Sequence, residues 1–434
     1  MNKFDGIKHA EIILDALKKE GAEKAVAGVT KKIKSEMNID SGNLSLYRTT
    51  ENISVSMTSL IDGKKGFIAG NDLNHNSIAE NAAKAVSLSH SSKKDEANDI
   101  SPEQPFEELS IGSNEPDSEK MYDRLKEFLD YTKSAYPSLQ LNQCVLDFTH
   151  AAKNYANSNN VRFTENTGVY SFSAMFFAKD SKGTSSFNYS GASHLNLNTP
   201  LKDWGGLDEI MRQTCEQTVT KPLTGSFTGD IIITPPNAAE FASLITRLFM
   251  GDMSLITETS IWKDKLNEKV CSPLFTLHSY PCKPQAEIPE LYTGDGFRLQ
   301  NTTLIDKGIL KEFVLGLYGA NKTGGKRCVS GGSSLVIEKG DVLKDSMIKG
   351  VKRGILLGRF SGGNPAANGD FSGVAKNSYL IEDGKIVQPL SETMIAGNLV
   401  KLLTDIIAVS KEEINYGSSS APWILSTGVT ISGK

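Results

Sequence analysis

The sequence lacks the features that would mark a membrane protein, a polyanion-binding protein or a disordered chain. None of its apolar runs approaches the roughly 18–20 residues that a membrane helix needs. Its 47 Lys and Arg residues are outweighed by 51 Asp and Glu residues, and the net charge of −4 argues against binding polyanions over the whole surface. Charged residues make up 23% and apolar residues 39%, a balance that indicates a globular protein.

Cysteine is scarce, and its spacing indicates no disulfide framework. The five cysteines are an odd number, widely scattered and without a CxxC pair. This pattern is typical of reduced thiols in a cytoplasmic protein. Residues 1–17 carry Asp5, Lys8, Glu11 and Asp15 among their apolar side chains, so we expect no signal peptide. We therefore expect a cytoplasmic protein with no membrane partner.

Histidine is scarce, and the positions of the six histidines do not match those of a conventional zinc hydrolase. None of the six histidines is followed by Glu, and no two lie within five residues of each other, which excludes an HExxH helix. The one local group with ligand chemistry is Cys271, His278 and Cys282. Its spacing matches no common zinc template. Both interpretations stay open, a metal site and three unrelated side chains.

The length of 434 residues predicts about three domains at roughly 150 residues each. Apolar periodicity predicts a helix, a hairpin sheet turning at Asp62 and Gly63, and a second helix over residues 1–90. Residues 91–119 are rich in Ser, Pro, Asp and Glu, which indicates a linker or an ordered surface loop. A middle α/β unit follows over 120–224, and the last unit covers 225–434.

Glycine is concentrated in the last unit. Of the 38 glycines, 22 lie between residues 290 and 434. Dense glycine among short apolar alternations favours turn-rich antiparallel sheet over alternating strands and helices. The predicted fold class is therefore α+β, with two mixed α/β units before a large antiparallel, β-rich C-terminal domain.

An ordered series of short segments in this last unit is more specific than any single motif. The segments are GDGFR at 294–298, LIDKGIL at 304–310, SGG at 330–332, GDFSG at 369–373, YLIEDGKI at 379–386 and IAGNL at 395–399. The series resembles the TldD/PmbA family, whose members were named for modulation of DNA gyrase and for maturation of peptide antibiotics. The resemblance covers nearly the whole chain, weakly before residue 225 and strongly after it. It implies that the C-terminal domain is a curled, barrel-like sheet.

Two subunit types pair within that family. The TldD type carries an HExxxH helix and a late cysteine that bind a metal and cleave peptides, and the PmbA type, also called TldE, lacks them. Here the corresponding positions hold Ala242, Ser243 and Arg247, and the late cysteine falls near Tyr416. Alanine and serine are poor zinc ligands and arginine repels a cation. The resemblance thus implies a PmbA-type subunit with no catalytic residue, metal or cofactor of its own.

The function that the resemblance implies is the non-catalytic half of a peptide-degrading or peptide-processing complex. Its partner would be a TldD-type metalloprotease subunit that holds zinc, and a homodimer would form when that partner is missing. Glycine-rich strands are expected to meet an extended peptide by strand pairing. The residues proposed for this groove are Gly331, Gly332, Gly369, Asp370 and Phe371.

Two other functions stay open. One is a metallopeptidase or other hydrolase that acts alone, through the Cys271, His278 and Cys282 group or through a site that the sequence does not reveal. The other is a gyrase-modulating binding protein. The basic clusters at 322–327 and 349–353 are not interleaved with aromatic residues, so nucleic acid is an unlikely partner.

Overall fold

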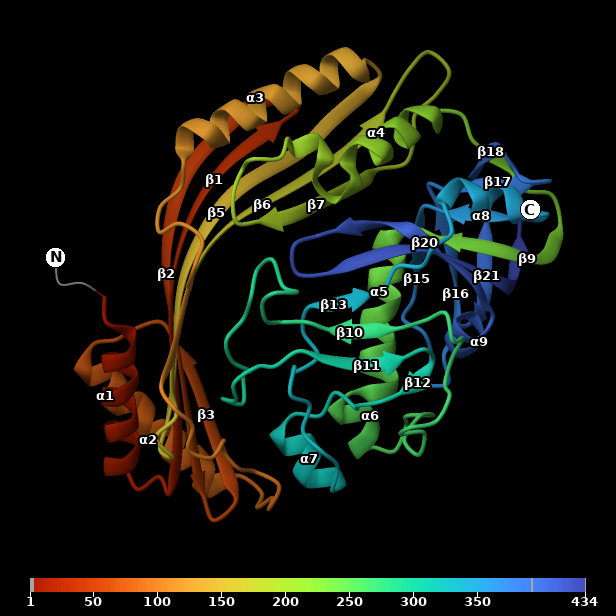
Figure 1. Ribbon diagram of the computed structural model, residues 1–434. Coiled ribbons are helices and arrows are strands. Elements are labelled where there is room, and N and C mark those ends of the chain that lie inside the picture. Colours follow the sequence, from red (N-terminus) through yellow and green to blue (C-terminus); the bar gives the residue numbers. More distant parts are fainter. Residues whose placement is uncertain (1–3, 392, 434) are drawn as a thin grey trace.

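The computed structural model describes residues 4–391 and 393–433. These residues form two β-sheets, one from each half of the chain. Figure 1 shows the long strands of the N-terminal sheet arching along one side of the C-terminal half. No helix in these two stretches is both long and apolar enough to cross a membrane.

The N-terminal sheet has seven strands in the order β3-β2-β1-β5-β6-β4, with β7 paired to β6. Its strands are β1 (Lys24–Asp40), β2 (Asn43–Ile61), β3 (Lys64–Gly70), β4 (Glu107–Ile111), β5 (Leu139–Asn157), β6 (Arg162–Ala178) and β7 (Asn188–His194). Its helices are α1 (Gly6–Lys19), α2 (His75–Ser91), α3 (Ser118–Ala135), the 3-10 turn η1 (Leu201–Gly206) and α4 (Leu207–Glu216).

Strand length decides how this sheet is built. β5 has 19 residues, so at about 3.3 Å per residue it is about 60 Å long and can support two separate cores. Helices α1 and α2 bury Ile13, Leu17 and Ile78 against one half of the sheet. Helix α3 buries Phe128 against the other half, in a second core shared with η1 and α4.

Local sequence explains several of these elements. Asp62 and Gly63 both adopt positive φ, 48° and 71°, and join β2 to β3 as the hairpin pattern predicts. The two helices expected within residues 1–90 correspond to α1 and α2. Among the long strands, β1 and β5 contribute side chains to both cores.

The chain between α2 and α3 is ordered and lies against both halves of the molecule. Within it, β4 pairs in parallel with β6, with Glu107 opposite Phe163. Gln104 donates to the carbonyl of Gly296 over 2.8 Å, and Asn321 donates to the carbonyl of Ala97 over 3.0 Å. Strands on both sides of this segment belong to one sheet, so the two predicted N-terminal units share their β-structure. The four-part division of the chain stays a prediction.

The C-terminal sheet has 14 strands, most of them short and antiparallel. They are β8 (Lys221–Pro222), β9 (Ser226–Ile233), β10 (Leu277–Ser279), β11 (Thr302–Asp306), β12 (Ile309–Leu310), β13 (Leu335–Ile337), β14 (Arg353–Leu357), β15 (Arg359–Gly362), β16 (Asp370–Lys376), β17 (Tyr379–Glu382), β18 (Lys385–Ser391), β19 (Met394–Asn398), β20 (Ile406–Asn415) and β21 (Ser420–Ser432). The helices are α5 (Pro235–Ile245), the π-helical turn η2 (Thr246–Met250), α6 (Asp252–Ile256), α7 (Leu317–Thr323), α8 (Lys344–Gly350) and α9 (Leu399–Thr404).

Helix α5 is the centre of the C-terminal core. Phe241 and Ile245 pack among side chains of β9, β21 and α9. Pairs such as β9 with β14 and β13 with β21 are parallel, so the sheet is mixed but mainly antiparallel. The fold is thus mixed α/β with large antiparallel-rich sheets. The strand pairings of the described residues close no barrel, and the barrel-like form stays a prediction.

Candidate functional site

The helix that would carry a metal motif is α5 together with the π-helical turn η2. Pro235 and Pro236 start the helix, where a missing N–H costs no internal hydrogen bond. Regular α-helical bonding ends at Ile245, and the π turn over Thr246–Met250 follows directly. Single π turns occur often at functional sites, because they change the direction of side chains along a helix.

The three motif positions on this helix face different surroundings. Ala242 is 1% exposed and packs in the C-terminal core. Ser243 is exposed, and its hydroxyl donates to the carbonyl of Ala239 in the preceding turn over 3.1 Å. Arg247 is exposed and donates to Oδ1 of Asn364 over 3.4 Å. A methyl group in the core, a hydroxyl that already has an acceptor and a cation do not fit zinc.

Arg247 lines a cleft of about 510 Å³, which we call the Arg247 cleft. The cleft also includes Asp252, Asp295, Arg327 and Gly331. Burial raises the pKa of the Asp252 carboxyl, and the charge of Asp295 raises it further. Both carboxylates already accept backbone hydrogen bonds at the start of α7, from the N–H of residue 316 over 2.9 Å and of residue 317 over 2.8 Å. They therefore hold the cleft wall in place.

Tyr416, at the position of the late cysteine, lies near the N-terminal sheet. Its carbonyl accepts from the N–H of Ser193 in β7 over 3.1 Å. Its hydroxyl is buried without a hydrogen-bond partner within the described residues, and burial raises its pKa. Tyr416 does not line the Arg247 cleft. The four motif positions therefore do not converge on one point.

Cys271, His278 and Cys282 are also held by separate partners. Cys271 is buried in the core, where desolvation raises its pKa to about 12. His278 stacks on Tyr280 at 4.4 Å, and its Nδ1 lies 2.9 Å from the hydroxyl of Thr303. The thiol of Cys282 lies 3.3 Å from the carbonyl of Leu299. Across residues 4–391 and 393–433, no three His, Cys, Asp or Glu side chains are grouped as metal ligands.

The residues expected in a peptide groove lie in different surroundings, with Gly369 buried beside Phe249 and Asp370 exposed. Gly331 lines the Arg247 cleft, whereas Gly332 is not among its lining residues and packs against Val314. Asp370 accepts from the amide of Asn398 over 2.8 Å. Phe371 is buried among aromatic side chains of the core. Their role in binding peptide stays a prediction, with Gly331 the member that faces an open cleft.

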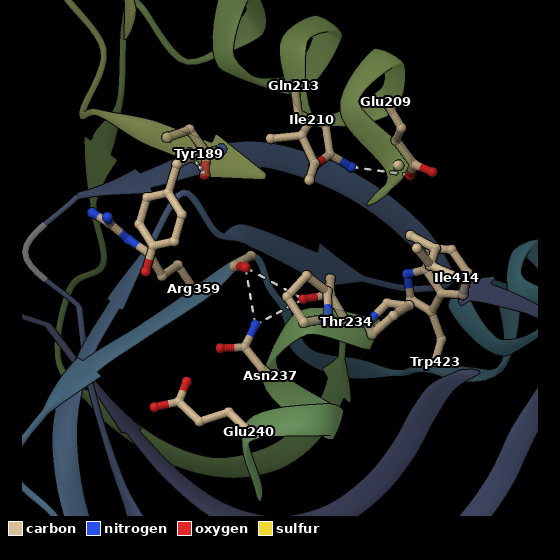
Figure 2. A pocket seen from close by; sticks show the side chains of 15 residues that line it. Tyr189, Glu209, Ile210, Gln213, Thr234, Asn237, Glu240, Arg359, Ile414 and Trp423 are labelled. Atoms are coloured by element: carbon tan, nitrogen blue, oxygen red, sulfur yellow. Dashed lines mark hydrogen bonds between the residues drawn. The ribbon is translucent and has the colours of Figure 1, made fainter. Parts of the chain in front are cut away.

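A second cavity lies between the two sheets and was not predicted. This inter-sheet pocket has a volume of about 250 Å³ and is lined by β7, α4, the start of α5, β15, β20 and β21. Figure 2 shows Ile210 and Gln213 of α4 on one side and Asn237 of α5 on the other, with Tyr189 and Arg359 at one end and Trp423 at the other. Its lining residues are up to 235 positions apart, since Asn188 and Trp423 both contribute. Among these residues, Pro235-Pro236-Asn237 is a local pattern that could have marked the start of a helix.

Asn237 shapes the floor of the inter-sheet pocket. Its side-chain amide donates to the carbonyl of Gly358 over 2.9 Å, and its Oδ1 accepts from the N–H of Phe360 over 2.9 Å. These bonds fix the backbone on both sides of Arg359. On the opposite wall, Glu209 accepts from Lys344 over 3.0 Å.

Comparison with known proteins relates the C-terminal part of the chain to a described family. Residues 226–433 match the family described as PmbA/TldA metallopeptidase C-terminal domain. Residues 226–433 therefore contain a C-terminal domain of the PmbA/TldD type. Sequence relatives include a zinc metalloprotease TldD homolog of Saccharolobus solfataricus, 27% identical over 42% of this chain and 44% of the relative. The metalloprotease PmbA of Escherichia coli O157:H7 is 26% identical over 51% of this chain and 49% of the relative.

The PmbA/TldD resemblance extends to whole-chain structure. A Bacteroides thetaiotaomicron protein named for modulation of DNA gyrase superposes with a TM-score of 0.88, at 23% identity and 100% coverage of both chains. TldE from Thermococcus kodakarensis superposes with a TM-score of 0.83, at 19% identity, covering 98% of this chain and 100% of that one. At these identities the likeness establishes the fold. In sequence, the chain spans less than half the length of the curated relatives it first matches.

Proposed function

We propose that this chain is the PmbA/TldE-type, non-catalytic subunit of a cytoplasmic TldD-type metalloprotease that degrades or processes peptides. In this proposal the zinc and the catalytic groups belong to the partner subunit. The present chain completes the complex and contributes surface around bound peptide.

The observation that carries the proposal is the side-chain chemistry of α5 and η2. Where the TldD type has two histidines and a glutamate, this chain has Ala242 in the core, Ser243 bonded to its own helix and the cation Arg247. A metal-activated water needs open coordination by neutral or anionic ligands, which these three side chains cannot supply. The Arg247 cleft instead offers a guanidinium to carbonyl or carboxylate oxygens of a peptide.

An unpaired sheet edge supports assembly with another subunit. β3 pairs with β2 only over residues 55–61, so the first part of β2 has β1 as its one strand neighbour in the described structure. Leu44, Leu46 and Tyr47 are 41%, 42% and 54% exposed on this edge. Exposed apolar side chains on an open edge favour pairing with a second chain. A TldD-type subunit would cover this edge, or a second copy when the partner is missing.

The proposal is tested by metal analysis and peptidase assays of the chain alone, a TldD-type subunit alone and the two together. We expect chelator-sensitive peptide cleavage from the mixture, and neither stoichiometric zinc nor cleavage from this chain alone. Stoichiometric zinc together with chelator-sensitive cleavage by this chain alone would contradict the proposal and favour an independent hydrolase.

The assembly surface is tested by Leu46→Lys, which places a charge on the open edge. We expect this variant to weaken association with the TldD-type subunit in size-exclusion chromatography, because a desolvated lysine opposes burial. Leu88→Lys is the matched control, since Leu88 is a 45% exposed leucine on α2. Equal association of both variants would remove the edge of β2 from the interface.

A further inference from the structure

The inter-sheet pocket has the composition of a binding site and shares no lining residue with the Arg247 cleft. Its apolar wall is made by Ile210, Ile414 and Trp423, from three different elements. Pro235 and Pro236 add two rings and no N–H donors at the start of α5. The volume of about 250 Å³ is below the roughly 300–1,000 Å³ of pockets for drug-sized ligands, which suits one large side chain.

Most polar groups of the pocket already have partners within the protein. The amide of Asn237 is used by the backbone of β15. Gln213 donates to Glu209 over 3.1 Å, and Glu209 also accepts from Lys344. Because these groups already have hydrogen-bond partners, they shape the walls of the pocket and offer little hydrogen bonding to a ligand.

Arg359 differs from these groups. Its Nε is buried and has no hydrogen-bond partner in the described residues. Its guanidinium lies 5.6 Å from the ring centroid of Tyr189. Glu240, about one helical turn after Asn237 on α5, is exposed and lines the same pocket. Arg359 as a whole is partly exposed, and a carboxylate bound in the pocket would pair with the accessible N–H groups of its guanidinium.

We propose that the inter-sheet pocket binds the C-terminal residue of a peptide that ends in a large apolar side chain. The side chain occupies the space between Ile210 and Trp423, and the terminal carboxylate pairs with Arg359. The exposed carboxylate of Glu240 can accept the N–H of that residue. The choice of peptide as ligand rests on the proposed function, whereas the apolar wall and the Arg359 Nε without an acceptor in the described residues do not.

Binding is tested by calorimetry on the chain alone, with three N-acetylated tripeptides. The probes are Ac-Ala-Ala-Phe with a free carboxylate, the same peptide as its C-terminal amide, and Ac-Ala-Ala-Ser with a free carboxylate. We expect the first to bind at least about tenfold more tightly than either of the others. Absence of binding by the first peptide, or equal binding of its amide, would overturn the proposal.

Two substitutions assign the contacts. Arg359→Gln is expected to remove the preference for acid over amide, and Arg359→Lys to keep part of it. Arg353→Gln is the matched control, because Arg353 stacks on Phe227 outside the pocket. Circular dichroism checks that each variant folds. Retention of the full preference by Arg359→Gln would overturn the assignment of the carboxylate to Arg359.

Fluorescence locates the side chain. Trp423 lines the pocket, whereas Trp204 and Trp262 belong to separate cores. The phenylalanine peptide is expected to change the emission of the wild-type chain, and Trp423→Phe to abolish that change while calorimetry still detects binding. An unaltered emission change in Trp423→Phe would place the ligand elsewhere. A chain that binds none of these peptides but activates a TldD-type subunit would overturn this proposal and leave the proposed function intact.

Discussion

At the scale of single residues, packing decides what the motif positions can do. Five residues along a regular α-helix turn through about 500°, so side chains at 242 and 247 would point about 140° apart. The π turn over Thr246–Met250 alters this angle, yet Ala242 still faces the core while Arg247 faces the cleft. Alanine at position 242, where the TldD-type motif has a histidine, thus fits a position that belongs to the core.

A histidine introduced at 242 tests this interpretation. Ala242→His is expected to lower the free energy of unfolding by about 1–3 kcal/mol, because a larger polar ring must enter a closely packed site. Ser243→His, on the exposed neighbour, is expected to change it by less than about 0.5 kcal/mol. Urea unfolding measures both. Equal stability of the two variants would show that position 242 has room for an imidazole.

His278 adds a pH dependence to stability. Burial holds its pKa below the ordinary value of 6.5, although the charges of Glu338 and Asp306 oppose this. The unfolded chain therefore takes up a proton at a higher pH than the folded chain. The contribution of neutral His278 to the free energy of unfolding is fully present above about pH 6.5 and is lost as the pH falls through the folded-state pKa.

Replacement of His278 removes that dependence. Unfolding free energies of wild type and His278→Gln, measured between about pH 8 and about pH 5, are expected to diverge as the pH falls. The wild type should lose more stability than the variant below the ordinary histidine pKa. Parallel curves would mean that His278 does not contribute to the acid loss of stability.

At the scale of elements, close contacts between helix and sheet depend on glycine. A Cβ at Gly66 of β3 would lie 1.9 Å from the carbonyl oxygen of Ala85 in α2. The helix can therefore pack on this strand only because the position has no side chain. Gly70, near the end of the same strand, has more room, since its Cβ would lie 3.6 Å from Nδ2 of Asn81.

The pair of glycines gives a matched test of this packing. Gly66→Ala is expected to cost about 1–3 kcal/mol of unfolding free energy, because α2 must move away from β3. Gly70→Ala is expected to cost less than about 0.5 kcal/mol. Thermal and urea unfolding measure the stability of both variants. An equal loss of stability in the two would contradict the close packing of α2 on Gly66.

At the scale of the whole molecule, polar contacts join the N-terminal sheet to the loop between β10 and β11. Glu165 of β6 is 2% exposed, pairs with Lys153 over 2.6 Å and accepts from the backbone N–H of Leu291 over 2.8 Å. Glu107 pairs with Arg298 over 2.7 Å at an exposed part of the same junction. The Glu165 contacts are buried and the Glu107 ion pair is solvated. We therefore expect Glu165 to contribute more to the free energy of unfolding than Glu107.

Substitution of the two carboxylates measures that difference. Glu165→Ala is expected to lower the free energy of unfolding by about 1–3 kcal/mol, because it leaves a buried N–H without an acceptor. Glu107→Ala is expected to cost about 0–1 kcal/mol, as is usual for exposed ion pairs. Limited proteolysis should cleave the Glu165 variant faster near the junction. Equal effects would mean that Glu165 does not hold the two halves together.

The sequence by itself determined the features that depend on near neighbours along the chain. The hairpin at Asp62 and Gly63, the amphipathic helices and the abundance of glycine in the C-terminal half all follow from local backbone and burial preferences. The segment series of 294–399 likewise identified the family, and the comparison over residues 226–433 confirmed it.

Only the tertiary structure decided which distant residues share a surface. It placed Gly331 beside Arg247, separated Cys271, His278 and Cys282, and brought Asn188 and Trp423 to one pocket. It also joined strands from two predicted units into one sheet. These outcomes depend on non-local strand pairing and on packing between layers, whose partners cannot be deduced from spacing along the chain.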